Sequence, residues 1–317
     1  MTYLDYDRYD ELVRRTVSQY VSPLVVSIGG HAVDGYVNLV LFFGPDATDP
    51  FEMSINYDDH EYKIADELIA EYSREIAVLM RQEGKIRKGP PAALIARLDI
   101  AGTSPSITLQ PVSYDLVAST GLALDFPHRL FEQHGGTLRD YYLSDRAGPS
   151  IANSPFPTCL GVCGLLVVET DDGSEILVAE RSSHLASLEN TVGPSAAGHI
   201  DYSNQYRSLA DVVEAGMRQE VREELNLKDD QFDVVPLAMA TELFRGERPQ
   251  LFCLVETTLG RKDIIDCLEA IPKSEREFAS YRFVKLQGKT AQETEDWDGL
   301  NFEAQMNVTL LRDHLLQ

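Results

Sequence analysis

Basic residues are scarce in this chain relative to acidic ones. Its 317 residues include 28 Lys and Arg against 51 Asp and Glu, which gives a formal net charge of −23 at pH 7. A polyanion of this size repels phosphate backbones, and no basic stripe in the sequence offsets that repulsion. Nucleic acid is therefore not expected as a partner. A small anionic ligand remains compatible if metal ions or a few Arg side chains reverse the charge locally.

Long apolar runs and cysteines are also few. No apolar stretch approaches the roughly 20 residues of a membrane helix, and the first residues carry acid where a signal peptide needs positive charge. The four cysteines, Cys159, Cys163, Cys253 and Cys267, fit no zinc-binding spacing. We expect a cytoplasmic protein with no membrane partner and with buried, reduced thiols.

The segment 144–157 divides the sequence, because it is rich in Ser, Asp, Gly, Pro and Asn, the composition of a linker. The predicted domains are 1–150 and 151–317. We expect the first to be a smaller α+β unit whose role the sequence does not indicate. Its predicted elements are helices at 1–20 and 59–84 and strands at 23–28, 36–43, 92–100 and 106–118.

The domain 151–317 opens with a predicted hairpin. A buried strand at 160–168 leads through the turn at 171–173 to a return strand at 175–180. The other predicted elements are strands at 232–240, 249–257 and 279–286, a closing amphipathic helix at 300–316, and a helix at 209–225.

The helix at 209–225 has a clear start, face and end. Ser208 and Asp211 form a predicted capping box, and Asn226 suits the left-handed residue that ends many helices. Apolar residues recur at every fourth position and should face a core. These residues are Leu209, Val213, Met217, Val221 and Leu225.

Glu220, Glu223 and Glu224 lie together on one flank of this helix. Their mutual repulsion costs a few tenths of a kcal/mol per pair, and anions are disfavoured at a helix C-terminus. A cluster placed against both effects indicates an external cation, and ligands that are all carboxylates favour Mg²⁺ or Mn²⁺. On the helix alone, a merely solvated acidic face is an equally good interpretation.

Combined with the preceding segment 194–201, the helix resembles the box of the Nudix hydrolases. That pattern is Gly, five residues, Glu, seven residues, then Arg-Glu-apolar-any-Glu-Glu-any-Gly-apolar. Its end aligns with the segment from Gln219 to Leu227, and Arg181-Ser182-Ser183 also lies where the family has such a segment. The resemblance covers about 158–227 closely and 228–317 loosely, and it does not extend to 1–150.

The departures from the pattern resemble one branch of that family. Gln219 replaces the box Arg, Asn226 the box Gly and Asp211 the upstream Glu, and residues 199–210 fill a gap that holds five positions in the family. The animal Nudix hydrolases that split UDP-glucose and UDP-galactose share the Gln, the Asn, an enlarged loop and a long extra N-terminal domain. In the family the Arg orients a catalytic Glu, and Gln can donate a neutral hydrogen bond about 1 kcal/mol weaker.

The resemblance implies a Nudix-type α/β/α sandwich with a mixed sheet, within an overall α+β fold. It also implies that Glu220, Glu223 and Glu224 are the catalytic and metal-binding residues, with the Gly198 carbonyl as a further ligand.

Anion binding and proton transfer are less narrowly defined by the sequence. Arg181 is a phosphate candidate by its position in the family. For Arg245, anion binding and a surface charge in a polar turn remain equally open. His199 is expected to face solvent more than phosphate, and the base is a box glutamate or a later acid such as Glu277.

The implied activity is Mg²⁺- or Mn²⁺-dependent cleavage of a nucleoside diphosphate derivative. A UDP-sugar giving UMP and a sugar phosphate is the favoured substrate. Alternatives are ADP-ribose or a dinucleotide as substrate, or an inactive Nudix fold that serves as a nucleotide sensor or scaffold. A homodimer is left open.

Overall fold

The computed structural model of the chain describes residues 3–4, 27–28, 31–32, 36–45, 47–86, 89–100, 104–143, 156–182, 188, 190–286 and 299–316. Most of the predicted helix at 1–20 and of the predicted linker at 144–157 lies outside these residues. Two short strands, β1 (Ser27–Ile28) and β2 (His31–Ala32), form a separate antiparallel pair.

A mixed sheet forms the centre of the fold. In spatial order its main strands are β13 (Phe278–Lys285), β8 (Gly173–Arg181), β7 (Gly161–Thr170), β12 (Arg248–Thr257), β11 (Phe232–Glu242) and β3 (Tyr36–Leu41). Strands β7 and β12 are parallel, whereas the other neighbouring pairs in this order are antiparallel. The short strand β9 (Val192–Gly193) pairs with β8, and β10 (Ala196–His199) pairs with β7.

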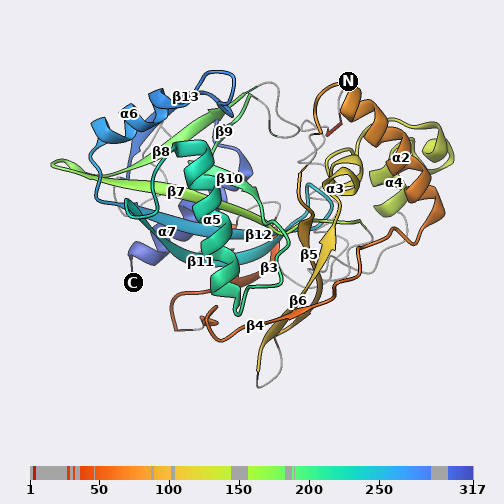
Figure 1. Cartoon of the computed structure of the whole chain (residues 1–317), viewed down its shortest axis with the longest axis horizontal. Helices are drawn as coiled ribbons and strands as arrows, with labels where there is room; N and C mark the ends of the chain where they lie inside the picture. Colours follow the sequence, from red (N-terminus) through yellow and green to blue (C-terminus); the bar gives the residue numbers. More distant parts are fainter. Residues whose placement is uncertain are drawn as a thin grey trace.

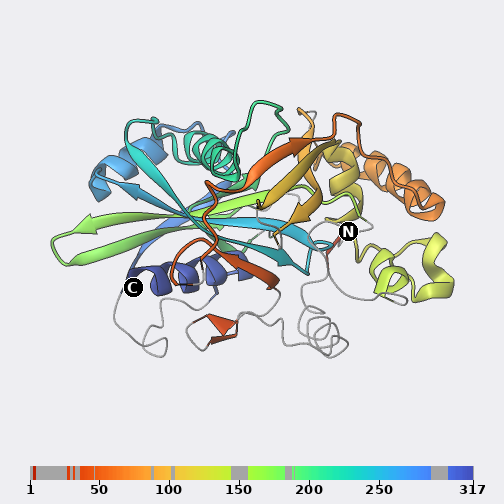
Figure 2. The ribbon, with the colours of Figure 1, turned by 90° about the horizontal axis from the view of Figure 1, so that it is seen from below.

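Helices cover both faces of this sheet. Helix α5 (Leu209–Leu225) lies on one face and α7 (Phe302–Leu315) on the other (Figures 1 and 2). Helix α6 (Arg261–Ala270), which the sequence did not predict, lies near α5. The predicted α+β class, with a mixed sheet between two helical layers, is confirmed.

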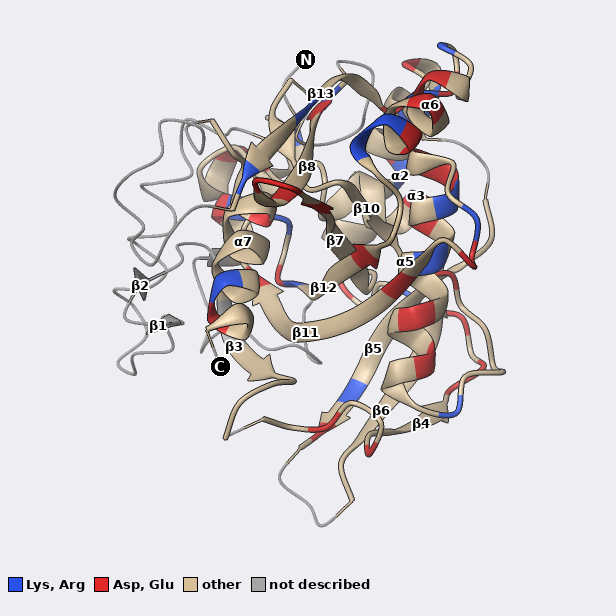
Figure 3. Cartoon of the chain, turned by 90° about the vertical axis from the view of Figure 1, so that its left-hand side faces the viewer, with Lys and Arg blue, Asp and Glu red and all other residues tan. Residues whose placement is uncertain are grey.

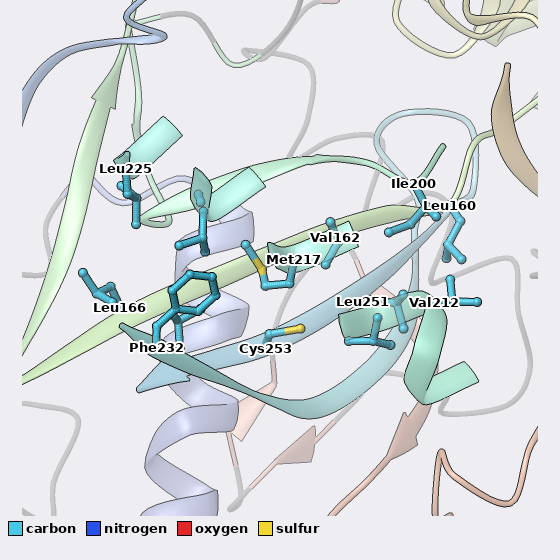
Figure 4. Packing of buried hydrophobic residues seen from close by; sticks show 14 of the residues in the cluster. Leu160, Val162, Leu166, Ile200, Val212, Met217, Leu225, Phe232, Leu251 and Cys253 are labelled. Atoms are coloured by element: carbon cyan, nitrogen blue, oxygen red, sulfur yellow. The ribbon is translucent and has the colours of Figure 1, made fainter. Parts of the chain in front are cut away.

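The predicted start, face and end of α5 are all present. Ser208 accepts a hydrogen bond from the Asp211 amide, Asp211 bonds back to the Ser208 amide, and Asn226 adopts φ 56°. The five residues of the apolar stripe are at most 1% exposed. They pack with β7, β11 and β12 in one hydrophobic cluster (Figure 4). Burying side chains of this size contributes about 1.5–3 kcal/mol each, so the stripe holds α5 on the sheet.

Gly216 brings α5 close to the chain that leaves β10. A Cβ at this position would collide with the side chain of Ile200, which is fully buried. The contact places the last turns of α5 directly beside β10. The helix end that carries the three glutamates therefore faces residues 196–199.

Strand β3 belongs to the central sheet, which differs from the sequence prediction. The strand predicted at 36–43 within the N-terminal unit pairs antiparallel with β11 at the edge of the central sheet. Tyr36 is 1% exposed and packs edge-to-face on Phe252 of β12. An apolar strand can pair with any sheet whose edge strand has unpaired backbone groups. The alternation of apolar residues in the sequence does not show which sheet that is.

The remaining N-terminal elements form a second, smaller sheet with helices (Figure 1). Its strands run in the order β4, β6, β5, with β4 parallel and β5 antiparallel to β6. The elements are β4 (Ser54–Tyr57), α2 (Glu67–Gln82), β5 (Ala92–Asp99), β6 (Ser106–Val112), α3 (Tyr114–Thr120), the 3₁₀ helix η2 (Arg129–His134) and α4 (Leu138–Leu143).

Two N-terminal predictions need correction. The helix predicted from residue 59 begins only at 67, because Asp66 caps it and the Asp58 and Tyr62 amides bond to carbonyls of β6. The strand predicted at 106–118 ends at Val112, and a helix follows. Ser113 occupies the N-cap position of that helix, and an acid in its first turn favours helix formation there.

Backbone hydrogen bonds join the second sheet to the central one. The Ala93 amide donates to the Ile200 carbonyl and the Leu160 amide to the Ala93 carbonyl, each at 2.7 Å. Met53, which precedes β4, and the inward residues of the small sheet such as Ile95 belong to the same hydrophobic cluster as α5. The two predicted domains are therefore in extensive contact.

Three of the cysteines are buried and Cys267 is half-buried, and all four are free thiols. None of the helices in the described ranges is long and apolar enough to cross a membrane.

The division at residue 150 is tested by cutting the chain there. We expect that cleavage at a protease site inserted between residues 148 and 149 leaves two fragments that co-elute and unfold in one transition, because β3 and β5 remain bonded across the cut. The measurement is size-exclusion chromatography with thermal unfolding, and the uncut chain is the control. Fragments that separate without denaturant, each unfolding cooperatively, would show two independent domains instead.

Candidate functional site

Two glutamates of α5 pack against the backbone of β10. The Ala197 amide donates to Oε2 of Glu224 at 3.0 Å, and a Cβ at position 198 would collide with the carboxylate of Glu220. Glycine at 198 is therefore required by the close approach of that carboxylate. The sequence predicted a bare backbone here for a different reason, access of the carbonyl to a metal ion.

Burial makes this carboxylate pair costly to ionise. Glu220 is 9% exposed, and burial, followed by repulsion from Glu223 and Glu277, raises its pKa to about 8. Burial and the negative charge of Glu220 raise the pKa of Glu224 well above its usual value. Removal of such groups from water favours the protonated forms unless a cation compensates. Among the described residues, no hydrogen bond or ion pair reaches Glu220.

Glu223 lies at the more exposed side of the same helix flank. Nε2 of Gln219 donates to its Oε1 at 3.1 Å. The neutral hydrogen bond expected of Gln219, in place of the family's Arg, is thus present. It connects residues one turn apart on α5 and orients the Glu223 carboxylate.

A cavity of about 490 Å³ opens beside these groups. Glu220 and Glu223 line one wall, and Arg181 and Arg248 also line it. Acidic positions are prominent on the ribbon of α5, whereas the cavity arginines come from β8 and β12 (Figure 3). The cavity therefore combines carboxylates with arginines that a phosphate group could contact.

Arg248 was not singled out from the sequence. Its Nη2 donates to the Gly198 carbonyl at 2.6 Å. The Nε atoms of Arg248 and Arg181 are both buried, and neither has a hydrogen-bond partner among the described residues. In the sequence, Arg248 is marked only by its position near Arg245 in a polar segment. That position does not show which residue of the strand directs its side chain into the cavity.

Arg245 is a buried structural cation. It is 4% exposed, and its guanidinium is bonded to the carboxylates of Glu242 and Glu303. The surface-charge interpretation is therefore wrong. Arg245 also lines the cavity, but its two carboxylate partners already offset its charge, so Arg248 is the better anion-binding candidate of the two.

His199 is not the solvent-facing residue that we expected. Its imidazole stacks on the ring of Tyr114, with centroids 4.7 Å apart and planes inclined by 19°, and it lines the cavity. Burial, followed by the charge of Arg248, lowers its pKa. Glu277, the later acid considered as a candidate base, also lines the cavity.

The donors near Gly198 are suitable for a hard divalent ion, although no group of three or more His, Cys, Asp and Glu side chains in the described ranges forms a metal site as it stands. The carboxylates of buried Glu220 and half-buried Glu224 have no ion-pair partner among the described residues and lie against the β10 backbone, and all of these donors are oxygens. Glu220 and Glu224 would hold such an ion, and the Gly198 carbonyl would join them if its hydrogen bond from Arg248 gave way. The metal remains a prediction.

No family model matches this chain, and no curated protein matches it. Solved structures with partial similarity include DR0079 from Deinococcus radiodurans (21% identity, 39% of this chain and 65% of that chain, TM-score 0.27). Others are an Ap4A hydrolase of C. elegans (13%, 50% and 96%, TM-score 0.31) and the NUDIX domain of Shewanella oneidensis NrtR complexed with ADP ribose (14%, 55% and 97%, TM-score 0.32). The chain spans 65% of the length of DR0079. Likenesses this low establish no family membership, so function rests on the site's own residues.

The raised pKa of Glu220 predicts a pH-dependent cost in the metal-free protein. The folded state binds this proton more tightly than the unfolded chain, so the stabilisation is complete below pH about 4.5 and is lost as the pH rises through about 8. The difference in free energy of unfolding between Glu220→Gln and wild type should therefore increase by a few kcal/mol, in favour of the variant, as the pH rises from 5 to 9. Urea unfolding in EDTA measures this gain, and Glu214→Gln, an exposed position on α5, is the control. A gain that does not change with pH would contradict the assignment.

Proposed function

We propose that this chain is a divalent-metal-dependent diphosphatase of the Nudix type. Its substrate would be a nucleoside diphosphate linked to another group, with a UDP-sugar as the first candidate and UMP and a sugar phosphate as products. The observation that carries the proposal is the packing of Glu220 against Gly198 and of Glu224 against the Ala197 amide. They lie beside a cavity that Glu220, Arg181 and Arg248 line.

The opposing charges of the cavity match the two requirements of a diphosphate. Carboxylates removed from water need a cation, and the guanidinium Nε atoms of Arg181 and Arg248, which have no hydrogen-bond partner among the described residues, need an acceptor. A metal-bound diphosphate satisfies both at once. Arg248, with its Nε unpaired and buried, would bind a phosphate oxygen, and Arg181 would bind another.

The chemistry that Mg²⁺ or Mn²⁺ supplies at this position is neutralisation of phosphate oxygens and acidification of the attacking water. Glu223 would take the proton from that water, because it lies at the cavity and Gln219 holds its carboxylate in place. Glu277, on the segment before β13, is the alternative base. Attack at one phosphorus breaks the P–O–P linkage and leaves two monophosphates.

The choice of a UDP-sugar rests on the sequence resemblance and not on the cavity. The Gln219 and Asn226 replacements, the long loop before α5 and the N-terminal extension are shared with the branch that splits UDP-glucose. ADP-ribose and dinucleotides present the same diphosphate to the same residues. A comparison of substrates therefore has to decide among them.

The experiment is a screen of nucleoside diphosphate derivatives with Mg²⁺ or Mn²⁺, with detection of released monophosphates. UDP-glucose should be cleaved fastest, and Glu223→Gln should lower kcat by about 10²–10⁴-fold, the usual contribution of a general base. Glu214→Gln, on the same helix but outside the cavity, should leave kcat unchanged. Gln219→Arg should be tolerated or mildly harmful.

A different pattern would point to the sensor alternative. If the wild type cleaves no diphosphate with either ion yet binds a nucleotide tightly, the chain is a nucleotide-binding protein and not a hydrolase. Activity that appears only in Gln219→Arg would identify a decayed enzyme. Equal loss of kcat in Glu223→Gln and Glu214→Gln would remove Glu223 from the proton transfer.

A further inference from the structure

The cavity has a second wall, which the N-terminal unit supplies. It includes Pro90 after α2, Tyr114 and Val117 of α3, and Leu122 beyond it. Of the lining residues between 84 and 122 in the described ranges, Lys85 alone carries a charge. The C-terminal wall, in contrast, carries acidic and basic side chains from β8, α5 and β12. The cavity is therefore charged on one side and mostly apolar on the other.

Tyr114 and His199 meet where the two walls join. Tyr114 is the first residue of α3, and His199 directly follows Gly198 at the end of β10. Their rings are stacked, and the imidazole side chain keeps 32% of its surface exposed. An aromatic pair thus lies next to the backbone that contacts the Glu220 carboxylate.

Backbone bonds fix this wall relative to the charged one. The amides of Ala93 and Tyr202 donate to carbonyls across the boundary, at 2.7 Å to Ile200 and 2.8 Å to Pro91. Near the end of α3, a Cβ at Gly121 would lie 3.1 Å from the Arg245 carbonyl oxygen. The N-terminal wall is therefore held firmly beside the charged groups, which a site needs in order to recognise two parts of one ligand.

We propose that this wall, with Tyr114 as its specificity-determining residue, binds the planar nucleobase of the ligand whose diphosphate lies at the charged wall. This proposal rests on the proposed function for the position of the diphosphate. Pro90, Val117 and Leu122 provide no side-chain hydrogen bonds for the hydroxyls of a sugar, whereas a base has a flat face that stacks on aromatic rings.

The test is a binding measurement that needs no turnover. α,β-Methylene-UDP and methylenediphosphonate carry the same bridged phosphorus pair and differ in the nucleoside, so isothermal titration with Mn²⁺ isolates the contribution of the nucleoside. Wild type should bind α,β-methylene-UDP the more tightly. Tyr114→Ala should weaken that binding about tenfold or more, the effect of losing a base–aromatic stack, and should leave methylenediphosphonate unchanged.

Two variants serve as controls. Tyr114→Phe keeps the ring and should bind both ligands nearly as wild type does. Tyr62→Ala removes another half-buried tyrosine, which packs on the same small cluster as Val117 but does not line the cavity. It should therefore leave the ratio of the two affinities unchanged.

Three outcomes would overturn the proposal. The first is equal affinity of wild type for both ligands, and the second is an equal loss of affinity for both ligands in Tyr114→Ala. The third is a raised KM for UDP-glucose in Tyr114→Ala while the affinity for α,β-methylene-UDP is unchanged. That result would assign the wall to the sugar. If the expected binding pattern holds and no diphosphate is hydrolysed, the base site stands and the proposed enzymatic function fails.

Discussion

The contact between the Gly198 backbone and the carboxylate of Glu220 is the constraint on which this site depends. It needs the helix α5 close to β10, which Gly216 and the buried apolar stripe provide, and it needs no side chain at 198. The same contact removes the carboxylate from water and raises its pKa to about 8. The proposed cation would offset this cost, because neither apolar packing nor the helix dipole favours a carboxylate there.

Local sequence signals predicted the elements nearest to this contact. The capping box, the four-residue apolar spacing and Asn226 defined α5 to the residue, because each of these features acts within one or two helical turns. The register of Glu220, Glu223 and Glu224 followed from the same spacing. The donor that orients Glu223 was also predictable, since Gln219 and Glu223 are neighbours on one helix face.

Contacts between distant segments were not predictable in this way. The apolar pattern of β3 suits any sheet edge, so its pairing with β11 could not be read from residues 36–43. Arg245 and Arg248 are three positions apart in one polar segment, yet one is bonded to Glu242 and Glu303 while the other reaches the Gly198 carbonyl. The expectation that His199 faces solvent was wrong because its stacking partner, Tyr114, lies 85 positions earlier in the sequence.

The most direct test of the account is diffraction from crystals soaked in Mn²⁺, with data recorded at the manganese absorption edge. We expect an anomalous peak within coordination distance of the Gly198 carbonyl and of at least two carboxylates among Glu220, Glu223 and Glu224. An anomalous peak located elsewhere, or none beside well-ordered carboxylates, would contradict it.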